Sequence, residues 1–146
     1  MSGLYQPAYP TNHPVAQSIK DFISKFYATS DSPGLTDEWV GCFREDATVI
    51  MGDRVAEGKE EIRKLRVSMW KKVASRRHVV VKVFPASFER IADMRAAEFM
   101  VFGAVTYVLK KGEEEAADWA AHAKLKRDGG VGSPWRFEYY KVYIQA

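Results

Sequence analysis

The segment from Glu98 to Leu109 constrains the fold more than any other part of the sequence. Its β-branched and aromatic content is typical of a long strand, and apolar side chains occupy both of its alternating faces. One set is Phe99, Val101, Val105, Tyr107 and Leu109, and the other is Met100, Phe102, Ala104, Thr106 and Val108. Because successive side chains of a strand point to opposite faces, both faces of this sheet need a cover. Helices of the same chain can cover one face, and a second copy of the chain is the simplest cover for the other.

Three helical segments and four further strands are expected around this strand. An apolar stripe from Val15 to Phe26 has helical spacing, a short helix follows Thr36, and a third amphipathic segment runs from Ile62 to Val73. The other expected strands are Ala47–Met51, Val79–Phe84, Ala117–Leu125 and Trp135–Ile144. The order is α-α-β-α-β-β-β-β, which predicts an α+β domain with an antiparallel sheet.

Length and composition favour one soluble domain. The chain has 146 residues, and its 22 basic and 19 acidic side chains leave a net charge of +3, too small to indicate a nucleic-acid partner. No apolar run is long enough to span a membrane, and the start does not resemble a signal peptide. Cys42 is the single cysteine, so we expect a cytoplasmic protein.

Residues 1–14, with three prolines, are expected to form an extended arm on the surface or on a partner subunit, and residues 15–146 a single domain.

Several short motifs resemble a known superfamily when taken in order. They are Phe26-Tyr27 with Asp31, Phe43-Arg44-Glu45-Asp46-Ala47, Gly58-Lys59-Glu60-Glu61-Ile62, Ser75-Arg76-Arg77-His78, Asp118-Trp119-Ala120 and Tyr140-Lys141-Val142-Tyr143. Together they are similar to the nuclear transport factor 2-like superfamily, and most of all to the small fungal members of its SnoaL-like branch. The resemblance covers roughly residues 15–145.

This resemblance implies a cone-shaped α+β barrel, in which three N-terminal helices wrap a curved sheet around an internal pocket. The superfamily includes polyketide cyclases, scytalone dehydratase, ketosteroid isomerase and epoxide hydrolases, and also binding modules with no chemistry. The fold is therefore a stronger inference than any one activity.

The resemblance also points to His78, Asp31 and Tyr27 as catalytic residues. In scytalone dehydratase, a histidine at the place of His78 works with an aspartate from the end of the first helix, where Asp31 lies in this sequence. An aspartate that binds a histidine fixes its tautomer and tunes its pKa for proton transfer. The alternative is that His78 forms an ordinary core hydrogen bond and Asp31 caps the turn at Ser32-Pro33.

This chain lacks one residue that is part of the dehydratase site. The dehydratase has a second histidine on the next long strand, whereas Phe102-Gly103-Ala104-Val105 contains no titratable group. We therefore expect a pocket that is more apolar than that of the dehydratase. Its expected wall residues are Trp119, Met51, Trp70, Phe102, Tyr107 and Tyr140. For Trp119, Trp70 and the two tyrosines, plain core packing is the alternative. The three histidines have no metal-binding spacing and no phosphate loop is found, so we expect no metal and no cofactor.

The expected function is a cofactor-independent cyclase or isomerase, or a dehydratase-like lyase, that acts on a small apolar metabolite. In it, His78 moves the proton, Asp31 orients His78, Tyr27 binds an oxygen and Trp119 stacks on the substrate. The alternative is a non-catalytic module of the same fold that binds a small ligand or dimerises. A roomy pocket with His78 exposed inside favours the enzyme, and a pocket filled by Trp119, Phe102 and Tyr107 favours the module. In both cases we expect a homodimer through the sheet face, without nucleic acid or membrane as a partner.

Overall fold

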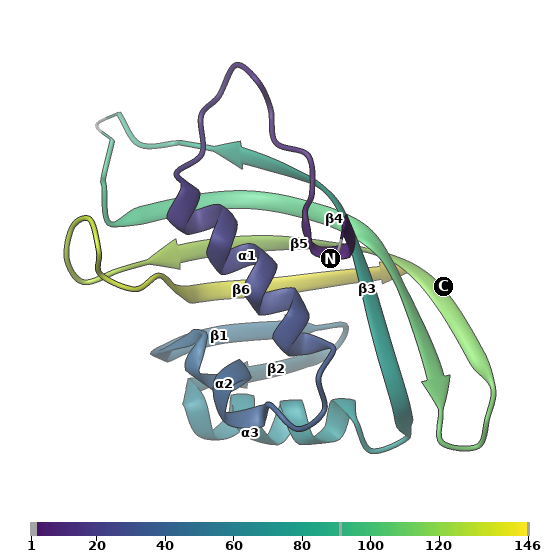
Figure 1. Cartoon of the computed structure of the whole chain (residues 1–146). Helices are drawn as coiled ribbons and strands as arrows, with labels where there is room; N and C mark the ends of the chain where they lie inside the picture. The colour runs from purple at the N-terminus through teal and green to yellow at the C-terminus, as the bar shows by residue number, and fades with distance from the viewer. Residues whose placement is uncertain (1–2, 91, 146) are drawn as a thin grey trace.

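The structure is a computed structural model that describes residues 3–90 and 92–145. A short 3-10 turn, Gly3–Tyr5, precedes three helices and six strands in the described residues. They are α1 (Gln17–Ser30), α2 (Thr36–Gly41), β1 (Phe43–Met51), β2 (Arg54–Glu57), α3 (Gly58–Met69), β3 (Val73–Ala86), β4 (Ala96–Leu109), β5 (Glu114–Lys126) and β6 (Arg136–Gln145). Figure 1 shows a curved sheet with α1 lying across its concave side and α2 and α3 at one end. The predicted α+β cone is confirmed.

The six strands form one sheet in the order β2-β1-β6-β5-β4-β3. Neighbouring strands are antiparallel except β1 and β6, which run parallel. The sheet is therefore mixed, not purely antiparallel as the sequence suggested. Parallel neighbours need a long connection, and here the connection contains α3 and the other strands of the sheet.

The first part of the sheet contains more strand than the sequence suggested. β1 starts at Phe43 instead of Ala47, and the short strand β2 was not predicted. Met51 pairs with Arg54, so only Gly52 and Asp53 form the turn between β1 and β2. Gly52 has φ +63°, a left-handed conformation that glycine adopts without steric cost. A Gly-Asp pair between two strand-like runs is a recognised hairpin signal, and it could have identified β2.

Helix α1 covers the concave face of the sheet with aromatic side chains. Ile23, Phe26 and Tyr27 are buried on this helix. The Phe26 ring packs edge-on against Phe137 and Tyr140 of β6, with ring centroids 4.7 and 5.3 Å apart. The apolar stripe of the helix predicts this packing, because side chains three and four residues apart share one helix face.

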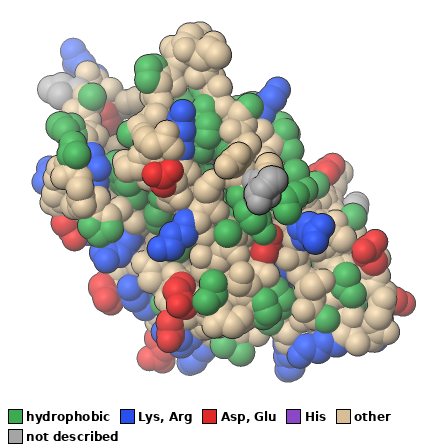
Figure 2. Space-filling model, in the orientation of Figure 1, with side chains coloured by type: hydrophobic (Ala, Val, Ile, Leu, Met, Phe, Trp, Pro, Cys, Tyr) green, Lys and Arg blue, Asp and Glu red, His purple; other side chains and the backbone are tan. Residues whose placement is uncertain are grey.

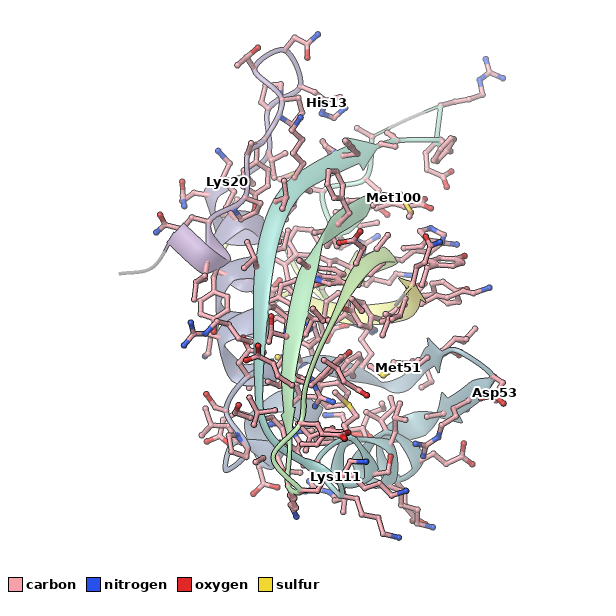
Figure 3. The ribbon with its side chains drawn as sticks, turned by 90° about the vertical axis from the view of Figure 1, so that its right-hand side faces the viewer. His13, Lys20, Met51, Asp53, Met100 and Lys111 are labelled. Carbon is pink, nitrogen blue, oxygen red and sulfur yellow. The ribbon has the colours of Figure 1, made fainter. Side chains whose placement is uncertain are left out.

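The two apolar sets of β4 have different environments. The set with Phe99, Val101 and Val105 is buried under the helices, whereas Met100 and Phe102 are 40% and 39% exposed. Figure 3 shows Met100 on the side of the sheet away from α1. The set containing Met100 and Phe102 is therefore the outer one.

The N-terminal arm lies on its own chain. Ala8 forms an isolated parallel bridge to β3, with its N–H donating to the Val81 carbonyl (2.9 Å) and its carbonyl accepting from the Val83 N–H (3.1 Å). The Ser24 hydroxyl of α1 donates to the Tyr5 carbonyl. These bonds hold the arm against both α1 and β3. In the described residues β3 is an edge strand of the sheet and pairs with β4.

Candidate active site

A small, partly open cavity lies between α1 and the concave face of the sheet. Its volume is about 90 Å³, and it is lined by Phe26, Ser30, Trp39, Met51, Met69, Arg76, His78, Val105, Tyr107, Trp119, Tyr140, Val142 and Ile144. An apolar cavity of about 150 Å³ holds one benzene molecule, so this one holds only a few heavy atoms without movement of its walls. His78 lines the cavity, as expected for an enzyme, but the cavity is not roomy.

Asp31 and His78 form a closely bonded pair beside this cavity. Asp31 follows the last residue of α1, and His78 lies on β3. Asp31 Oδ1 is 2.6 Å from His78 Nδ1, and Asp31 Oδ2 accepts the main-chain N–H of His78 at 2.8 Å. The two side chains are only 7% and 15% exposed. Because an ionised carboxylate can only accept, Nδ1 carries the hydrogen, and Nε2 is left without a partner among the described residues.

Tyr5 of the arm completes the hydrogen bonds of Asp31. Its hydroxyl donates to Asp31 Oδ2 at 2.7 Å. Burial, and then the hydrogen bond to Asp31, raise the pKa of Tyr5, so this hydroxyl keeps its proton. Sequence reasoning missed Tyr5, because a tyrosine in a proline-rich arm carries no periodic signal that would place it near residue 31.

Tyr27 and Tyr140 share a buried hydrogen bond between their hydroxyl oxygens, 2.8 Å apart. Burial raises the pKa of both groups, so both remain neutral donors. Tyr140 lines the cavity. Tyr27, which was expected to bind a substrate oxygen, does not line it and lies behind Tyr140. The Tyr27 ring packs beside His78 and Trp119, with centroids 5.4 and 5.0 Å away.

Trp119 lies across β4 because residue 103 is a glycine. Its Nε1–H donates to the Ala104 carbonyl at 2.9 Å. A Cβ at Gly103 would lie 3.2 Å from Trp119 Cζ2 and 1.8 Å from the Val79 carbonyl oxygen. The indole stands edge-on to His78, with centroids 5.4 Å apart at an interplanar angle of 84°. The wall next to His78 is thus aromatic and fixed by the backbone of β4.

Arg76 is the second residue that sequence reasoning missed. Its Nη2 donates to the carbonyl of Met69, the last residue of α3, at 3.0 Å, an ordinary contact for a basic residue near a helix end. Arg76 also lies two residues before His78 on β3 and lines the same cavity. The period of two along a strand could have identified it, had the strand been extended back to Val73.

The other predicted wall residues divide into two groups. Met51, Tyr107, Trp119 and Tyr140 line the cavity, whereas Trp70 packs behind it against Arg76. The prediction that Phe102 lines the pocket is wrong. Phe102 lies on the outer face of β4, where it packs against Phe84 with centroids 5.8 Å apart. The roles of all these residues in binding remain predictions.

Neither a metal-binding cluster nor a membrane-crossing helix is found in the described part of the chain. In residues 3–90 and 92–145, no group of three or more His, Cys, Asp or Glu side chains is arranged to hold a metal ion. None of the described helices combines the length and apolar character needed to cross a membrane.

Comparison with known proteins yields similarity in structure only. No protein-family model matches the chain, and no curated protein matches its sequence. Among solved structures, hexachlorocyclohexane dehydrochlorinase LinA-type3 from Novosphingobium barchaimii LL02 is similar with a TM-score of 0.73 and 13% identity, over 89% of this chain and 86% of that one.

Two further solved structures are similar to the same extent. ActVI-ORFA from Streptomyces coelicolor has a TM-score of 0.69 and 15% identity, over 88% of this chain and 96% of its own. A variant of Rv3472, a protein of unknown function from Mycobacterium tuberculosis, has a TM-score of 0.72 and 18% identity, over 88% of this chain and 70% of its own. These neighbours share the cone-shaped α+β fold of this chain.

Proposed function

We propose that this protein is a cofactor-independent cyclase or isomerase, or a dehydratase-like lyase, that moves a proton on a small, largely apolar molecule held in the cavity. One observation carries the proposal: a histidine oriented by a buried aspartate lines a small, aromatic cavity. A histidine held in one tautomer next to a space for the substrate is the arrangement that general acid–base catalysis requires.

In this proposal His78 Nε2 takes a proton from a carbon atom of the substrate. Asp31 holds Nδ1–H and stabilises the positive charge that develops on the imidazole. The electron pair left on the substrate moves toward an oxygen, where the Tyr140 hydroxyl, supported by Tyr27, donates a hydrogen bond. His78 then returns the proton at another atom, or to a leaving group. Trp119 supplies the flat wall on which the substrate lies.

One neighbour supports the class of chemistry and no finer detail. One similar structure carries the name dehydrochlorinase, and loss of hydrogen chloride requires a base for the proton. A second candidate, a non-catalytic binding module, draws support from two observations. The cavity is small, and Val105 of β4 lines it in the stretch where the dehydratase has its second histidine.

Hydrogen exchange in D₂O tests the proposal with a panel of compounds in place of an identified substrate. Small ketones, enones and cyclic alcohols are incubated with the protein, and NMR and mass spectrometry report deuterium uptake, isomerisation or loss of water. We expect the wild type to act on at least one compound, and His78→Gln to lose about 100-fold or more of that rate.

His122→Gln is the matched control. His122 Nε2 lies 2.6 Å from Glu98 Oε2, so it forms a similar His–carboxylate pair, but on the outer face of the sheet. Its loss should leave the rate unchanged. Equal rates in the wild type and His78→Gln would exclude this mechanism, and a panel on which no variant acts would favour the binding module.

A further inference from the structure

Two guanidinium groups, one fully buried and one partly buried, lie on the same tryptophan beside the cavity. Arg66 of α3 and Arg76 of β3 both stack on the ring of Trp70, with their Cζ atoms 5.4 and 5.0 Å from its centroid. Neither forms an ion pair with a carboxylate among the described residues. Asp31 is the one carboxylate that favours the charge on both arginines, and the neighbouring Tyr107 hydroxyl also favours the charge on Arg76. With His78 neutral, two positive charges therefore face one negative charge.

Each guanidinium group has one buried nitrogen without a hydrogen-bond partner among the described residues, Nε of Arg66 and Nη1 of Arg76, but the two groups differ in how many carbonyls accept from them. Arg66 is fully buried and donates to three main-chain carbonyls at the end of α1, those of Ser30 (2.9 Å), Thr29 (3.3 Å) and Ser32 (2.6 Å). The carboxyl end of a helix carries partial negative charge, so these carbonyls compensate for much of the Arg66 charge. Arg66 thus has a structural role.

Arg76 has fewer partners and lines the cavity. One main-chain carbonyl, that of Met69, accepts a hydrogen bond from its Nη2. Its Nη1 is buried and has no hydrogen-bond partner among the described residues. Tyr107 stacks on its other side, with the Arg76 Cζ 5.1 Å from the ring centroid. Burial is the main cause of the raised pKa of Tyr107, so this neighbour is a neutral phenol and supplies no counter-charge.

We propose that Arg76 binds a carboxylate of the substrate through its guanidinium group, so that the small molecule next to His78 is a mostly apolar organic acid. This deepens the proposed function and rests on the same cavity. A buried donor without a partner is costly, and a buried charge is normally paired, so a carboxylate would satisfy both. The carboxylate would also add a second negative charge to that of Asp31, so that two negative charges balance the positive charges of Arg66 and Arg76.

The position of Arg76 makes it a specificity residue. Arg76 and His78 lie two residues apart on one face of β3, about 6–7 Å along the strand. A carboxylate at Arg76 therefore leaves a carbon atom one or two bonds away within reach of His78 Nε2. A carboxylate is preferred over a phosphate because the cavity, at about 90 Å³, takes few atoms beyond the anion itself.

The test compares two probes of nearly equal shape, isobutyrate and isobutyramide, by NMR titration of the full chain at pH 7. Methyl phosphate is the third probe. The variants are Arg76→Gln, Arg76→Lys, His78→Gln and, as a matched control with the same loss of charge, Arg77→Gln at the exposed next residue. Dissociation constants come from the shifts of amides around the cavity.

We expect the wild type to bind isobutyrate roughly ten-fold or more tightly than isobutyramide, because a hydrogen bond to a charged group adds that much. Arg76→Gln should abolish this preference, while Arg77→Gln and His78→Gln keep it. Retention in His78→Gln separates this proposal from the proposed function, since binding of the acid can hold even if His78 does no chemistry.

Several results would overturn the assignment. They are equal binding of acid and amide by the wild type, no binding of either, an unchanged preference in Arg76→Gln, or tighter binding of methyl phosphate than of isobutyrate. If Arg76→Gln does not fold, Arg76→Lys takes its place. Lysine keeps the charge but lacks the paired donors of the guanidinium group, so we expect a weaker preference for isobutyrate than in the wild type. A folded Arg76→Lys with the full wild-type preference would overturn the role of the guanidinium group.

Discussion

At the scale of single residues, Gly103 is where the site tolerates the least added volume. A methyl group there would collide with the Val79 carbonyl and press on the Trp119 ring. We predict that Gly103→Ala destabilises the fold by about 3 kcal/mol or more, because neither a backbone carbonyl nor a packed indole can move away. Urea unfolding measures this. Gly130→Ala is the control, since an added Cβ at Gly130 meets nothing within 4 Å. A Gly103→Ala protein as stable as the wild type would show that β3 and β4 are less closely apposed than described.

Tyr5 gives a second prediction at this scale. Its hydroxyl is one of three donors to Asp31 and ties the arm to the site. Tyr5→Phe should lower the free energy of unfolding by about 1 kcal/mol, the usual net contribution of one hydrogen bond. Tyr143→Phe removes an exposed hydroxyl and should change stability by less than about 0.5 kcal/mol. Equal stability of Tyr5→Phe and the wild type would mean that the arm does not hold Asp31 in solution.

At the scale of elements, Arg66 connects two helices that the site depends on. From α3 it donates to three carbonyls at the end of α1, next to Asp31. Arg66→Met keeps much of the packing on Trp39 and Trp70 but leaves those carbonyls unsatisfied. We predict a loss of about 2–4 kcal/mol in urea unfolding.

Arg63→Met on the same helix serves as the control for Arg66. Arg63 forms an exposed ion pair with Asp37, which contributes about 0–1 kcal/mol. If both variants lose the same amount of stability, the carbonyl contacts of Arg66 add nothing, and the end of α1 is held by other means.

Elements with strong periodicity were predictable from the sequence, and those fixed by tertiary contacts were not. The stripe of α1 and the alternation of β5, with Ala117, Trp119, Ala121 and Ala123 buried, are as expected. β1 starts four residues early because Phe43 pairs with Phe137 across an irregular register, which no local pattern encodes. Both faces of β4 are apolar, so only the packing of α1 decides that Phe102 faces outward.

The candidate site was predictable to a similar degree. The resemblance predicted that Asp31 and His78 interact, although they lie 47 residues apart in the sequence. The structure places them in hydrogen-bond contact. Arg76 and Tyr5 were missed for different reasons. Arg76 sits where a basic residue near a helix end has an ordinary explanation, and the place of Tyr5 depends on how the arm docks on β3.

At the scale of the whole molecule, the outer face of the sheet remains uncovered in a single chain. Phe84, Met100, Phe102 and Tyr143 are each about 40–50% exposed there, and Phe84 pairs with Met100 across β3 and β4. On the face seen in Figure 2, acidic and basic side chains are interspersed, in keeping with the small net charge. We propose that the chain forms a homodimer through the outer face of the sheet.

Two neighbouring substitutions test this dimer. Phe102→Asp places a charge on the outer face and should give folded monomers or a precipitate, whereas Val101→Asp places it in the core and should unfold the chain. Sedimentation equilibrium at micromolar concentration should show a wild-type species of twice the 16.6 kDa chain mass. A wild-type species of 16.6 kDa alone would rule out the dimer.

The tautomer of His78 tests the central claim most directly, because every proposed step depends on a free Nε2 at the cavity. Long-range ¹H–¹⁵N NMR of the imidazole distinguishes its two nitrogen atoms. At a pH where His78 is neutral, we predict a hydrogen on Nδ1, held by Asp31, and an unprotonated Nε2. In Asp31→Asn the amide can donate to Nδ1, so the hydrogen should move to Nε2. A wild-type His78 with its hydrogen on Nε2, unchanged by Asp31→Asn, would contradict the proposed role of the pair.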